Sequence, residues 1–238
     1  MMYLGSATES SIVHPVAPRN SDTACVPQGL DAHLASGSVR LMKTREHVFA
    51  AGDRHTHLYR VESGAVCLYK IMPDGRRQVL DFAYAGDFIG LGCQAEHTLS
   101  AQVLEPTRLK CLPVATLSRI TERDPRLGLK LYEAMSKELA ATQDHLFTVG
   151  QRSAAERVAC FLLALSRRNA SRNQDCKTIV LPMTRSDIAD FLGLTIETVS
   201  RTLTKLRSSK LIDLEQCTIV RLLDIMKLER LAEGEASV

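Results

Sequence analysis

The chain has 238 residues, a formal net charge of +3 at pH 7 and 45% hydrophobic residues. This length favours two domains, and the hydrophobic content is enough to form buried cores. No apolar run approaches the ~18–20 residues of a membrane span, and the first residues lack the basic start and apolar core of a secretory signal. We therefore expect a cytoplasmic protein with no membrane partner.

Seven cysteines are scattered along the chain, and their odd number favours reduced, unpaired thiols in the cytoplasm. We interpret most of them as ordinary buried side chains. Reactivity depends on exposure and on a lowered thiol pKa, which a sequence does not reveal. A redox input therefore stays open for Cys67, Cys93, Cys111 and Cys217.

The first part of the chain changes from a polar tail to a β pattern. Residues 1–28 are rich in Ser, Pro and Ala, and we interpret them as a mobile tail. Short alternating runs follow, broken by Gly, Pro and Asp, and Asp74-Gly75 predicts a hairpin turn. Several strands at such spacing predict an all-β barrel or roll, which we place within residues 29–123.

Helical periodicity begins after Pro113, with a short helix at 114–123 and a long one from about Asp124. Within residues 124–150 the long helix carries a stripe at alternating steps of four and three, typical of a coiled-coil seam. The alternative is a helix that packs only on its own β domain. We expect a parallel homodimer seam, imperfect at Gly128 and Thr142, made by Tyr132, Met135, Leu139, Thr142, Leu146 and Val149.

Residues 151–238 form the last predicted domain. A helix is expected at 151–168, a polar loop at 169–175 and a strand at 178–183. After the segment discussed next, LIDLEQCTIVRL at 211–222 predicts a two-stranded hairpin. Residues from about Leu231 are interpreted as a tail.

Residues 184–207, TRSDIADFLGLTIETVSRTLTKLR, predict two short helices joined by a sharp turn. Gly193 stands where a left-handed turn is needed, with Ala189 four residues before it and Val199 six after it. Thr184 with Asp187, and Thr195, are expected to cap the two helices. The apolar stripes include Ile188, Phe191 and Leu192 in the first helix and Ile196, Val199, Leu203 and Leu206 in the second. This spacing is typical of a helix-turn-helix.

The polar face of the second helix suits DNA recognition. Glu197, Ser200 and Arg201 lie three and four residues apart and so share one face. In a major groove, Arg reads guanine, Glu accepts from cytosine and Ser serves several base edges. Between residues 152 and 210, eleven basic and five acidic residues leave about +6, as expected for phosphate contacts. A hairpin with a merely solvated polar face is the alternative. We expect Ile196, Glu197, Ser200 and Arg201 to contact bases of double-stranded DNA, and Arg185, Thr195, Thr204, Lys205 and Arg207 to contact its backbone.

The order of a β-roll, a long helix and a winged helix-turn-helix resembles the CRP/FNR family of bacterial transcription regulators over nearly the whole chain. GDFIGL at 86–91 is similar to the family's roll motif, and Glu197-x-x-Ser200-Arg201 is similar to the FNR-type recognition signature. GLTIETVSRTLTKL most resembles the FixK branch, which regulates low-oxygen respiration and nitrogen-fixation genes. The resemblance implies an α+β protein with a cyclic-nucleotide-binding-like roll, half-sites related to TTGAT, and contact with RNA polymerase through a solvent-facing loop at Arg76–Phe82.

The same resemblance implies that two family cofactors are absent. Leu91 stands where cyclic-AMP-binding members have Glu, and Leu99-Ser100 stands at their Arg-Ser, so nothing there neutralises a buried phosphate. Oxygen-sensing members hold an iron–sulfur cluster with an N-terminal cysteine group and one roll cysteine. Cys111 matches the roll cysteine, but Cys25 alone stands in the N-terminal region, and a cubane needs four thiolates.

Other chemistry has weaker signals. His55 and His57 alternate as if on one strand face, and with Cys93 and His97 they offer metal or haem ligands; half-exposed histidines and a packed thiol are the simpler interpretation. The chain has no Gly-rich phosphate loop, no nucleophile elbow and no His-Glu-x-x-His helix, so we expect no enzyme and no catalytic residues. The alternative to an effector-free homodimeric activator is a regulator of the same fold whose DNA binding requires a ligand, a metal or a thiol change.

Overall fold

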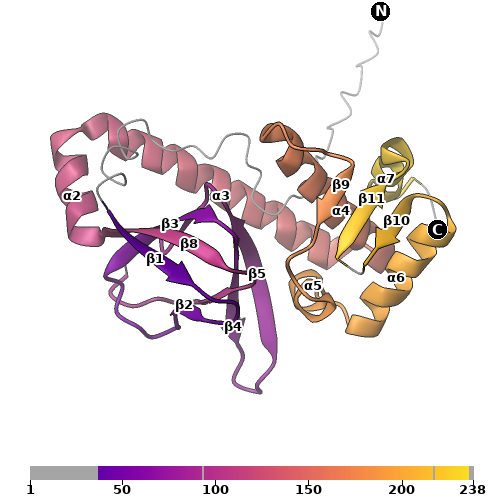
Figure 1. Cartoon of the computed structure of the whole chain (residues 1–238), viewed down its shortest axis with the longest axis horizontal. Helices are drawn as coiled ribbons and strands as arrows, with labels where there is room; N and C mark the ends of the chain where they lie inside the picture. The colour runs from indigo at the N-terminus through magenta and orange to yellow at the C-terminus, as the bar shows by residue number, and fades with distance from the viewer. Residues whose placement is uncertain (1–36, 93, 217, 236–238) are drawn as a thin grey trace, which may run out of the picture.

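The computed structural model describes residues 37–92, 94–216 and 218–235. The expected tail at 1–28 lies outside the described residues, as do Cys25, Cys93 and Cys217. A β domain, a long helix and a mixed C-terminal domain follow one another along the chain (Figure 1). The predicted α+β class is therefore confirmed.

The β domain consists of two four-stranded antiparallel sheets whose facing sides form one core. The strand orders are β1-β8-β3-β6 and β2-β7-β4-β5. Val61 and Leu109 of the first sheet and Val66 and Val103 of the second are almost completely buried in this core. The strands are β1 (Ser38–Met42), β2 (His47–Phe49), β3 (His57–Ser63), β4 (Ala65–Ile71), β5 (Arg77–Tyr84), β6 (Phe88–Ile89), β7 (Ser100–Val103) and β8 (Thr107–Pro113).

The hairpin between β4 and β5 turns at Asp74-Gly75, as predicted. Gly75 adopts φ 85°, a value that glycine reaches without a steric cost. The expected solvent-facing loop at Arg76–Phe82 is wrong in its extent, because β5 begins at Arg77. Phe82 is fully buried, since this side of β5 packs against the C-terminal domain.

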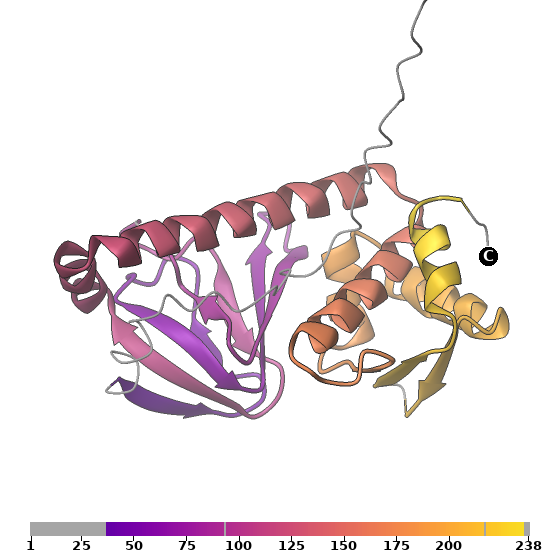
Figure 2. The ribbon, with the colours of Figure 1, turned by 90° about the horizontal axis from the view of Figure 1, so that it is seen from above.

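Two helices follow the β domain. Helix α2 (Val114–Arg123) ends at Asp124, which then caps helix α3 (Pro125–Gln151) by accepting a hydrogen bond from the Arg126 amide at 3.1 Å. Pro125 stands in the first turn of α3, where a missing amide hydrogen costs nothing. Helix α3 runs the length of the molecule, past both domains (Figure 2).

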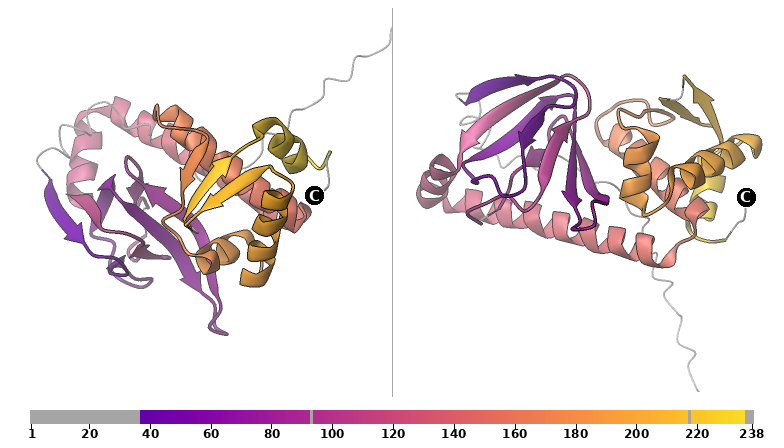
Figure 3. Two further views of the ribbon diagram at one scale, coloured as in Figure 1. Left: turned by 45° about the vertical axis from the view of Figure 1, so that its right-hand side comes forward. Right: turned by 90° about the horizontal axis from the view of Figure 1, so that it is seen from below.

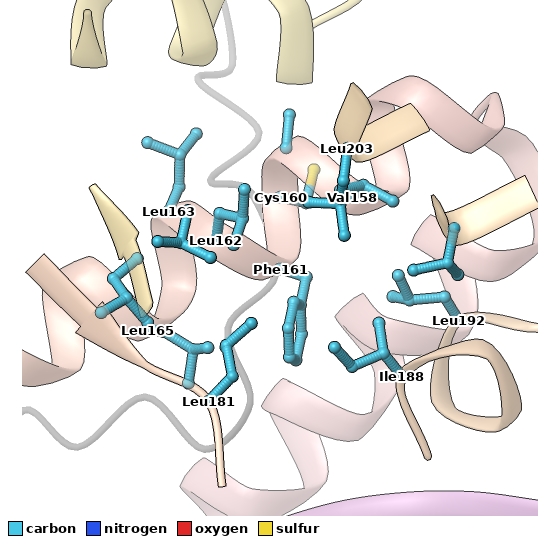
Figure 4. Close-up of a cluster of buried hydrophobic side chains, with 14 of the residues drawn as sticks. Val158, Cys160, Phe161, Leu162, Leu163, Leu165, Leu181, Ile188, Leu192 and Leu203 are labelled. Atoms are coloured by element: carbon cyan, nitrogen blue, oxygen red, sulfur yellow. The ribbon is translucent and has the colours of Figure 1, made fainter. Parts of the chain in front are cut away.

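The C-terminal domain packs four helices around a small sheet of order β10-β11-β9. Phe161 and Leu162 of α4 meet Ile188 and Leu192 of α5 and Leu203 of α6 in its core (Figure 4). The predicted hairpin after the helix-turn-helix is confirmed as β10 and β11. The elements are α4 (Ala154–Ser171), β9 (Thr178–Val180), α5 (Arg185–Leu192), α6 (Ile196–Ser208), β10 (Ile212–Glu215), β11 (Ile219–Leu222) and α7 (Ile225–Ala232).

Several expected boundaries in this domain are wrong. The helix expected from Gln151 begins at Ala154, because Ser153 and Glu156 form a capping box that defines its start. The same helix continues to Ser171, so the polar loop is shorter than expected. The tail expected from Leu231 is instead the end of α7, where Leu228 and Leu231 are almost completely buried.

The two domains touch along β5. Phe82 of β5 lies 5.2 Å from Phe191 of α5 and 6.3 Å from Phe161 of α4, measured between ring centroids. Asp87, in the GDFIGL segment, forms a buried ion pair with Arg168 of α4. Figure 1 shows β5 at the side of the roll next to α5, and the right view of Figure 3 shows α3 running along the roll as far as the C-terminal domain.

Among the described residues, the helices are all too short or too polar to cross a membrane.

Candidate nucleic-acid interface

The first helix of the predicted helix-turn-helix begins with a complete capping box. The Thr184 hydroxyl accepts from the Asp187 amide at 3.1 Å, and Asp187 Oδ2 accepts from the Thr184 amide at 2.9 Å. Two amides that a helix start leaves without partners are thereby satisfied. Burial alone would raise the pKa of Asp187, but hydrogen bonds from Thr184 and Arg77 hold it below the ordinary value. The cap therefore stays ionised near neutral pH.

The turn between the helices depends on Gly193. Gly193 adopts φ 63° and ψ 42°, the left-handed conformation predicted for it, and the Leu194 amide donates to the Ala189 carbonyl at 3.0 Å. An added Cβ at Gly193 would lie 3.2 Å from Cγ1 of Val149 on α3. Ala189 and Val199 are buried at the helix contact. The small residues thus allow α5, α6 and the end of α3 to meet closely.

Helix α6 has one buried and one exposed face. Val199, Leu203 and Leu206 are buried, as predicted, but Ile196 is 46% exposed and does not belong to the apolar stripe. The reason is its place in the first turn, which projects past the core. The exposed residues of α6 include Ile196, Glu197, Ser200, Arg201, Thr204, Lys205 and Arg207.

The exposed N-terminal half of α6 combines both charge signs. The pKa of Glu197 lies below its ordinary value because of backbone hydrogen bonding, the Thr195 hydroxyl and, to a smaller extent, Arg201. Arg201 Nε lies 3.4 Å from the Glu197 carbonyl, one turn earlier. An ionised carboxylate acceptor and a guanidinium donor therefore stand side by side on a surface that a groove could accommodate.

The candidate backbone contacts differ in their surroundings. Lys205 and Arg207 are exposed in the last turns of α6, while Arg185 on α5 is half-buried. Thr195 uses its hydroxyl to cap α6 by accepting from the Thr198 amide at 3.2 Å. Thr204 donates to the Ser200 carbonyl at 2.9 Å. The two threonines thus have roles inside the protein as well.

A hollow of about 400 Å³ beside α6 was not expected from the sequence. It lies between the N-terminus of α4, at Ser153, and the cationic side chains of Arg201 and Lys205. The first amides of a helix carry a partial positive charge and bind anions. The Ser153-Ala-Ala-Glu156 capping box could have predicted where this helix starts, but no local signal places that start beside α6.

The expected dimer seam on α3 is largely exposed. Leu146 is 74% exposed, and Tyr132, Met135, Leu139 and Thr142 are exposed as well. Val149 is half-buried because it lies against the Gly193 turn. Leu129 and Phe147 are further exposed apolar residues of α3 that the heptad pattern did not include.

The histidines of the β domain do not form the expected strand face. His55 precedes β3, and its Nε2 lies 2.5 Å from the Gly90 carbonyl, whereas His57 begins β3 and contacts the Thr56 hydroxyl at 2.9 Å. His97 is buried and stacks on Phe49 at 3.7 Å. Within residues 37–92, 94–216 and 218–235, no group of three or more His, Cys, Asp or Glu side chains could hold a metal ion. Cys93 lies outside these ranges.

The described roll thiols are packed rather than exposed. Cys67 and Cys111 are buried, and burial raises the pKa of both, to about 12 for Cys67. Cys160 of α4 is buried too, and burial also raises its pKa. These environments favour the unreactive thiol form at neutral pH.

The positions that bind cyclic AMP in the resembling family have other roles here. Leu91 packs with an apolar cluster that includes Leu58, Leu112 and Leu127, between the roll and helices α2 and α3. Ser100 is buried and accepts from the Ala51 amide at 3.0 Å. Leu99 is half-buried.

Comparison with protein families gives two matches. Residues 35–124 match the cyclic nucleotide-binding domain, and residues 156–231 match the Crp-like helix-turn-helix domain. The two matched segments contain the β domain with α2, and most of the domain that carries α5 and α6.

Similar proteins include two from rhizobia and their relatives. The nitrogen fixation regulation protein FixK of Bradyrhizobium diazoefficiens is 40% identical over 204 residues, which cover 86% of this chain and 82% of that protein. The transcriptional activatory protein AadR of Rhodopseudomonas palustris is 39% identical over 188 residues, covering 79% of this chain and 78% of that protein. Among solved structures, FixK2 from Bradyrhizobium japonicum superposes with a TM-score of 0.78 at 31% identity, covering 85% of this chain and 98% of that one.

Proposed function

Because the chain belongs to the CRP/FNR family of transcription regulators, we propose that it is a homodimeric, sequence-specific activator of low-oxygen respiration or nitrogen-fixation genes. The chain is a DNA-binding transcription regulator related to FixK and AadR, and not an enzyme. The observation that carries the finer proposal is the exposed set Glu197, Ser200 and Arg201 on α6.

Base recognition is assigned to the N-terminal half of α6. Arg201 reads guanine O6 and N7 as a fork, and Glu197 accepts from a neighbouring cytosine N4. Ser200 contacts a thymine, and exposed Ile196 touches a thymine methyl group. The FNR-type signature supports half-sites related to TTGAT, arranged as an inverted repeat roughly one helical turn apart.

Backbone contacts hold the protein in register without reading sequence. Lys205, Arg207 and Arg185 supply positive charge, and Thr195 and Thr204 are exposed. Lys205 also lines the hollow beside Ser153, where the first amides of α4 add a partial positive charge.

Dimerisation through α3 brings a second copy of α6, which contacts the other half of the inverted repeat. The exposed apolar side chains of Tyr132, Met135, Leu139 and Leu146 support a seam with a second copy, flanked by Thr142 and Val149. Burying such residues removes apolar surface from water, worth about 25 cal/mol per Å². Contact with RNA polymerase is proposed for the exposed tip of the β4–β5 hairpin, which includes Arg76.

DNA binding is proposed to need no cyclic nucleotide and no iron–sulfur cluster. Leu91 occupies an apolar cluster, and Cys111 is a buried core residue rather than an exposed ligand. A gel shift with metal-free, ligand-free protein separates this proposal from a gated sensor, because a sensor would bind cognate DNA only after its effector is added.

The substitution Arg201→Ala tests the base assignment. It removes a guanine-reading fork, so cognate affinity should fall by about 1–3 kcal/mol and preference should relax at one base pair. Fluorescence anisotropy on the cognate duplex and on duplexes changed at each position measures both effects.

The matched control is Lys205→Ala, one turn along the same helix. It should weaken cognate and scrambled duplexes alike and lower the slope of log K against log salt by about one unit. Equal losses on cognate and scrambled DNA for Arg201→Ala would contradict its role in base reading.

A further inference from the structure

Arg77 is one of several roll residues that contact the helix-turn-helix domain, and it forms an ion pair with helix α5. Arg77, the first residue of β5, donates from Nη1 to Asp187 Oδ1 at 2.5 Å and lies 3.6 Å from Asp190 Oδ2. The side chains of Arg77 and Asp187 are 25% and 9% exposed, so this ion pair is largely shielded from water. Both acidic partners belong to α5, the first helix of the helix-turn-helix.

The roll orients Arg77 before it reaches α5. Its guanidinium carbon lies 4.3 Å from the Tyr69 ring centroid, and its Nη2 donates to Cys67 Sγ at 3.2 Å. Tyr69 and Cys67 are both buried residues of β4. An arginine held in this way loses little side-chain freedom when it forms the ion pair.

The partner carboxylate is also the cap of α5. While Oδ1 of Asp187 receives Arg77, Oδ2 receives the Thr184 amide at 2.9 Å and its hydroxyl at 2.6 Å. The position of Arg77 is therefore coupled directly to the position of the α5 N-terminus. Gln78 adds a second link, because its Nε2 donates to the Asp190 carbonyl at 2.6 Å.

Helix α5 is held from a second side by α3. The His145 ring of α3 stacks on Phe191 at 4.2 Å, and Phe82 of the roll lies 5.2 Å from the same ring. From α4, Arg157 Nη1 donates to the Leu192 carbonyl at 3.0 Å. The helix that precedes the recognition helix is thus enclosed by the roll, the long helix and its own domain.

The covalent link between α3 and the C-terminal domain does not by itself set their angle. Helix α3 ends at Gln151 and α4 begins at Ala154, with Arg152 and Ser153 in extended conformations between them. Two non-helical residues give the backbone several soft dihedral angles. Contacts therefore determine how the domain sits on α3, both those of α5 and those of the linker residue Arg152, which is buried and donates to the Ala232 carbonyl.

We infer that Arg77 is a positioning residue for DNA recognition, which by holding α5 sets the half-site spacing that the dimer accepts. This inference rests on the proposed function, since spacing has meaning only for a dimer on an inverted repeat. Arg77 does not contact a base itself. It affects the orientation of α6 indirectly, because it binds Asp187 of α5.

The spacing between half-sites determines how far the second one is rotated around the duplex. Each base pair inserted between half-sites turns the second one by about 34–36° around the duplex axis. A recognition helix held rigidly on α3 cannot follow this rotation and loses contacts. A domain released from the roll can follow it in part, but it loses affinity at the best spacing because more freedom is lost on binding.

Arg77→Gln tests the inference, with Arg76→Gln as the matched control. Arg76 is the preceding residue, is 79% exposed and pairs with Asp74 inside the hairpin. Dissociation constants are measured for symmetric duplexes at the best spacing, at one and two base pairs more or less, and for a single half-site. For wild type and Arg76→Gln, the dissociation constant at the best spacing should be about tenfold or more lower than at the other spacings. For Arg77→Gln, this ratio should be about threefold or less.

Two further variants separate positioning from folding. Arg77→Lys keeps the charge and should give an intermediate spacing preference. Gln78→Ala should weaken the spacing preference, as Arg77→Gln does. If Arg77→Gln unfolds, the spacing preference of Gln78→Ala tests the inference instead. Half-site affinity should stay within about twofold of wild type for every folded variant, because the α6 surface is unchanged. A wild-type spacing preference in folded Arg77→Gln, or in Gln78→Ala where Arg77→Gln unfolds, would overturn the inference.

A measurement without DNA keeps the inference separate from the proposed function. Amide hydrogen exchange in α5 should be faster in Arg77→Gln than in wild type and unchanged in Arg76→Gln. If wild type bound no symmetric duplex, the proposed function would fail. Hydrogen exchange alone would then test whether Arg77 positions α5. Unchanged α5 exchange in Arg77→Gln would overturn the contact's positioning role.

Discussion

Phe191 shows how much of this protein's organisation passes through single residues. Its ring contacts Phe82 of the roll, Phe161 of α4 and His145 of α3. The sequence marks Phe191 only as an apolar residue of a short amphipathic helix. Which of several buried aromatic residues joins three elements depends on tertiary packing, and local periodicity does not contain that information.

His145 makes this junction sensitive to pH. Burial lowers the pKa of His145, with a smaller contribution from nearby Arg157, and the backbone of Phe191 acts in the opposite direction. A histidine whose folded pKa is depressed binds its proton more readily in the unfolded chain. The free energy of unfolding should therefore fall as pH drops below about 6.5, the ordinary histidine pKa.

The variant His145→Gln should make this pH dependence shallower. Chemical denaturation between pH 7.5 and 5.5, compared for wild type and variant, measures the slopes. His57→Gln, whose ring contacts Thr56 and Tyr59 away from α5, serves as the control. A residual slope is expected in the variant, because burial lowers the pKa of His97 as well. Identical slopes for wild type and His145→Gln would rule out this role of His145.

Residues with a purely local role were the most predictable. Gly193 in a left-handed turn, Thr184 with Asp187 as a cap, and Thr195 as a second cap were all expected and are all present. Each depends on neighbours within a few positions. The contact from Arg77 to Asp187 joins residues 110 positions apart, and no signal in one sequence pairs them.

At the scale of elements, long patterns were easier to recognise than short ones. Helices α2 and α3 and the wing hairpin lie close to their expected positions, and the roll strands fall within the expected residues 29–123, because alternation and heptad spacing extend over many residues. Helix α7 was missed, since its eight residues offer only two turns of periodicity after a hairpin. The start of α4 was also misplaced. Only Arg152 and Ser153 separate it from α3, and the apolar patterns of the two helices are nearly continuous in the sequence.

Helix α3 carries a prediction about assembly. If its exposed stripe is the dimer seam, Leu139→Lys places two like charges opposite each other in an apolar contact. The dimer dissociation constant should then rise about a hundredfold or more. Sedimentation equilibrium over a range of protein concentrations measures it.

Ala140→Lys is the control for this substitution. It adds the same charge one residue further along α3, at an exposed position off the seam. It should leave the dimer intact. A dimer equally stable with lysine at position 139 would place the interface elsewhere on the molecule.

In the whole molecule, the C-terminal domain carries the proposed DNA surface, and the roll contacts the helices next to that surface. The excess of positive charge gathers between residues 152 and 210, although the chain as a whole is only +3. The roll contributes few groups to the proposed DNA surface, but it contacts α5 and α4 through Arg77, Phe82 and Asp87. The expectation of separate domains was useful for the fold, yet it concealed this shared interface.

In the proposed complex, two copies of α6 read an inverted repeat in the order set by Glu197, Ser200 and Arg201. Selection of bound DNA from a random pool, with purified protein under reducing and under oxidising conditions, tests it most directly. We expect enrichment of a symmetric, TTGAT-related repeat with one preferred spacing in the reducing buffer, without added ligand. A bound pool with no symmetric sequence in either buffer would contradict it.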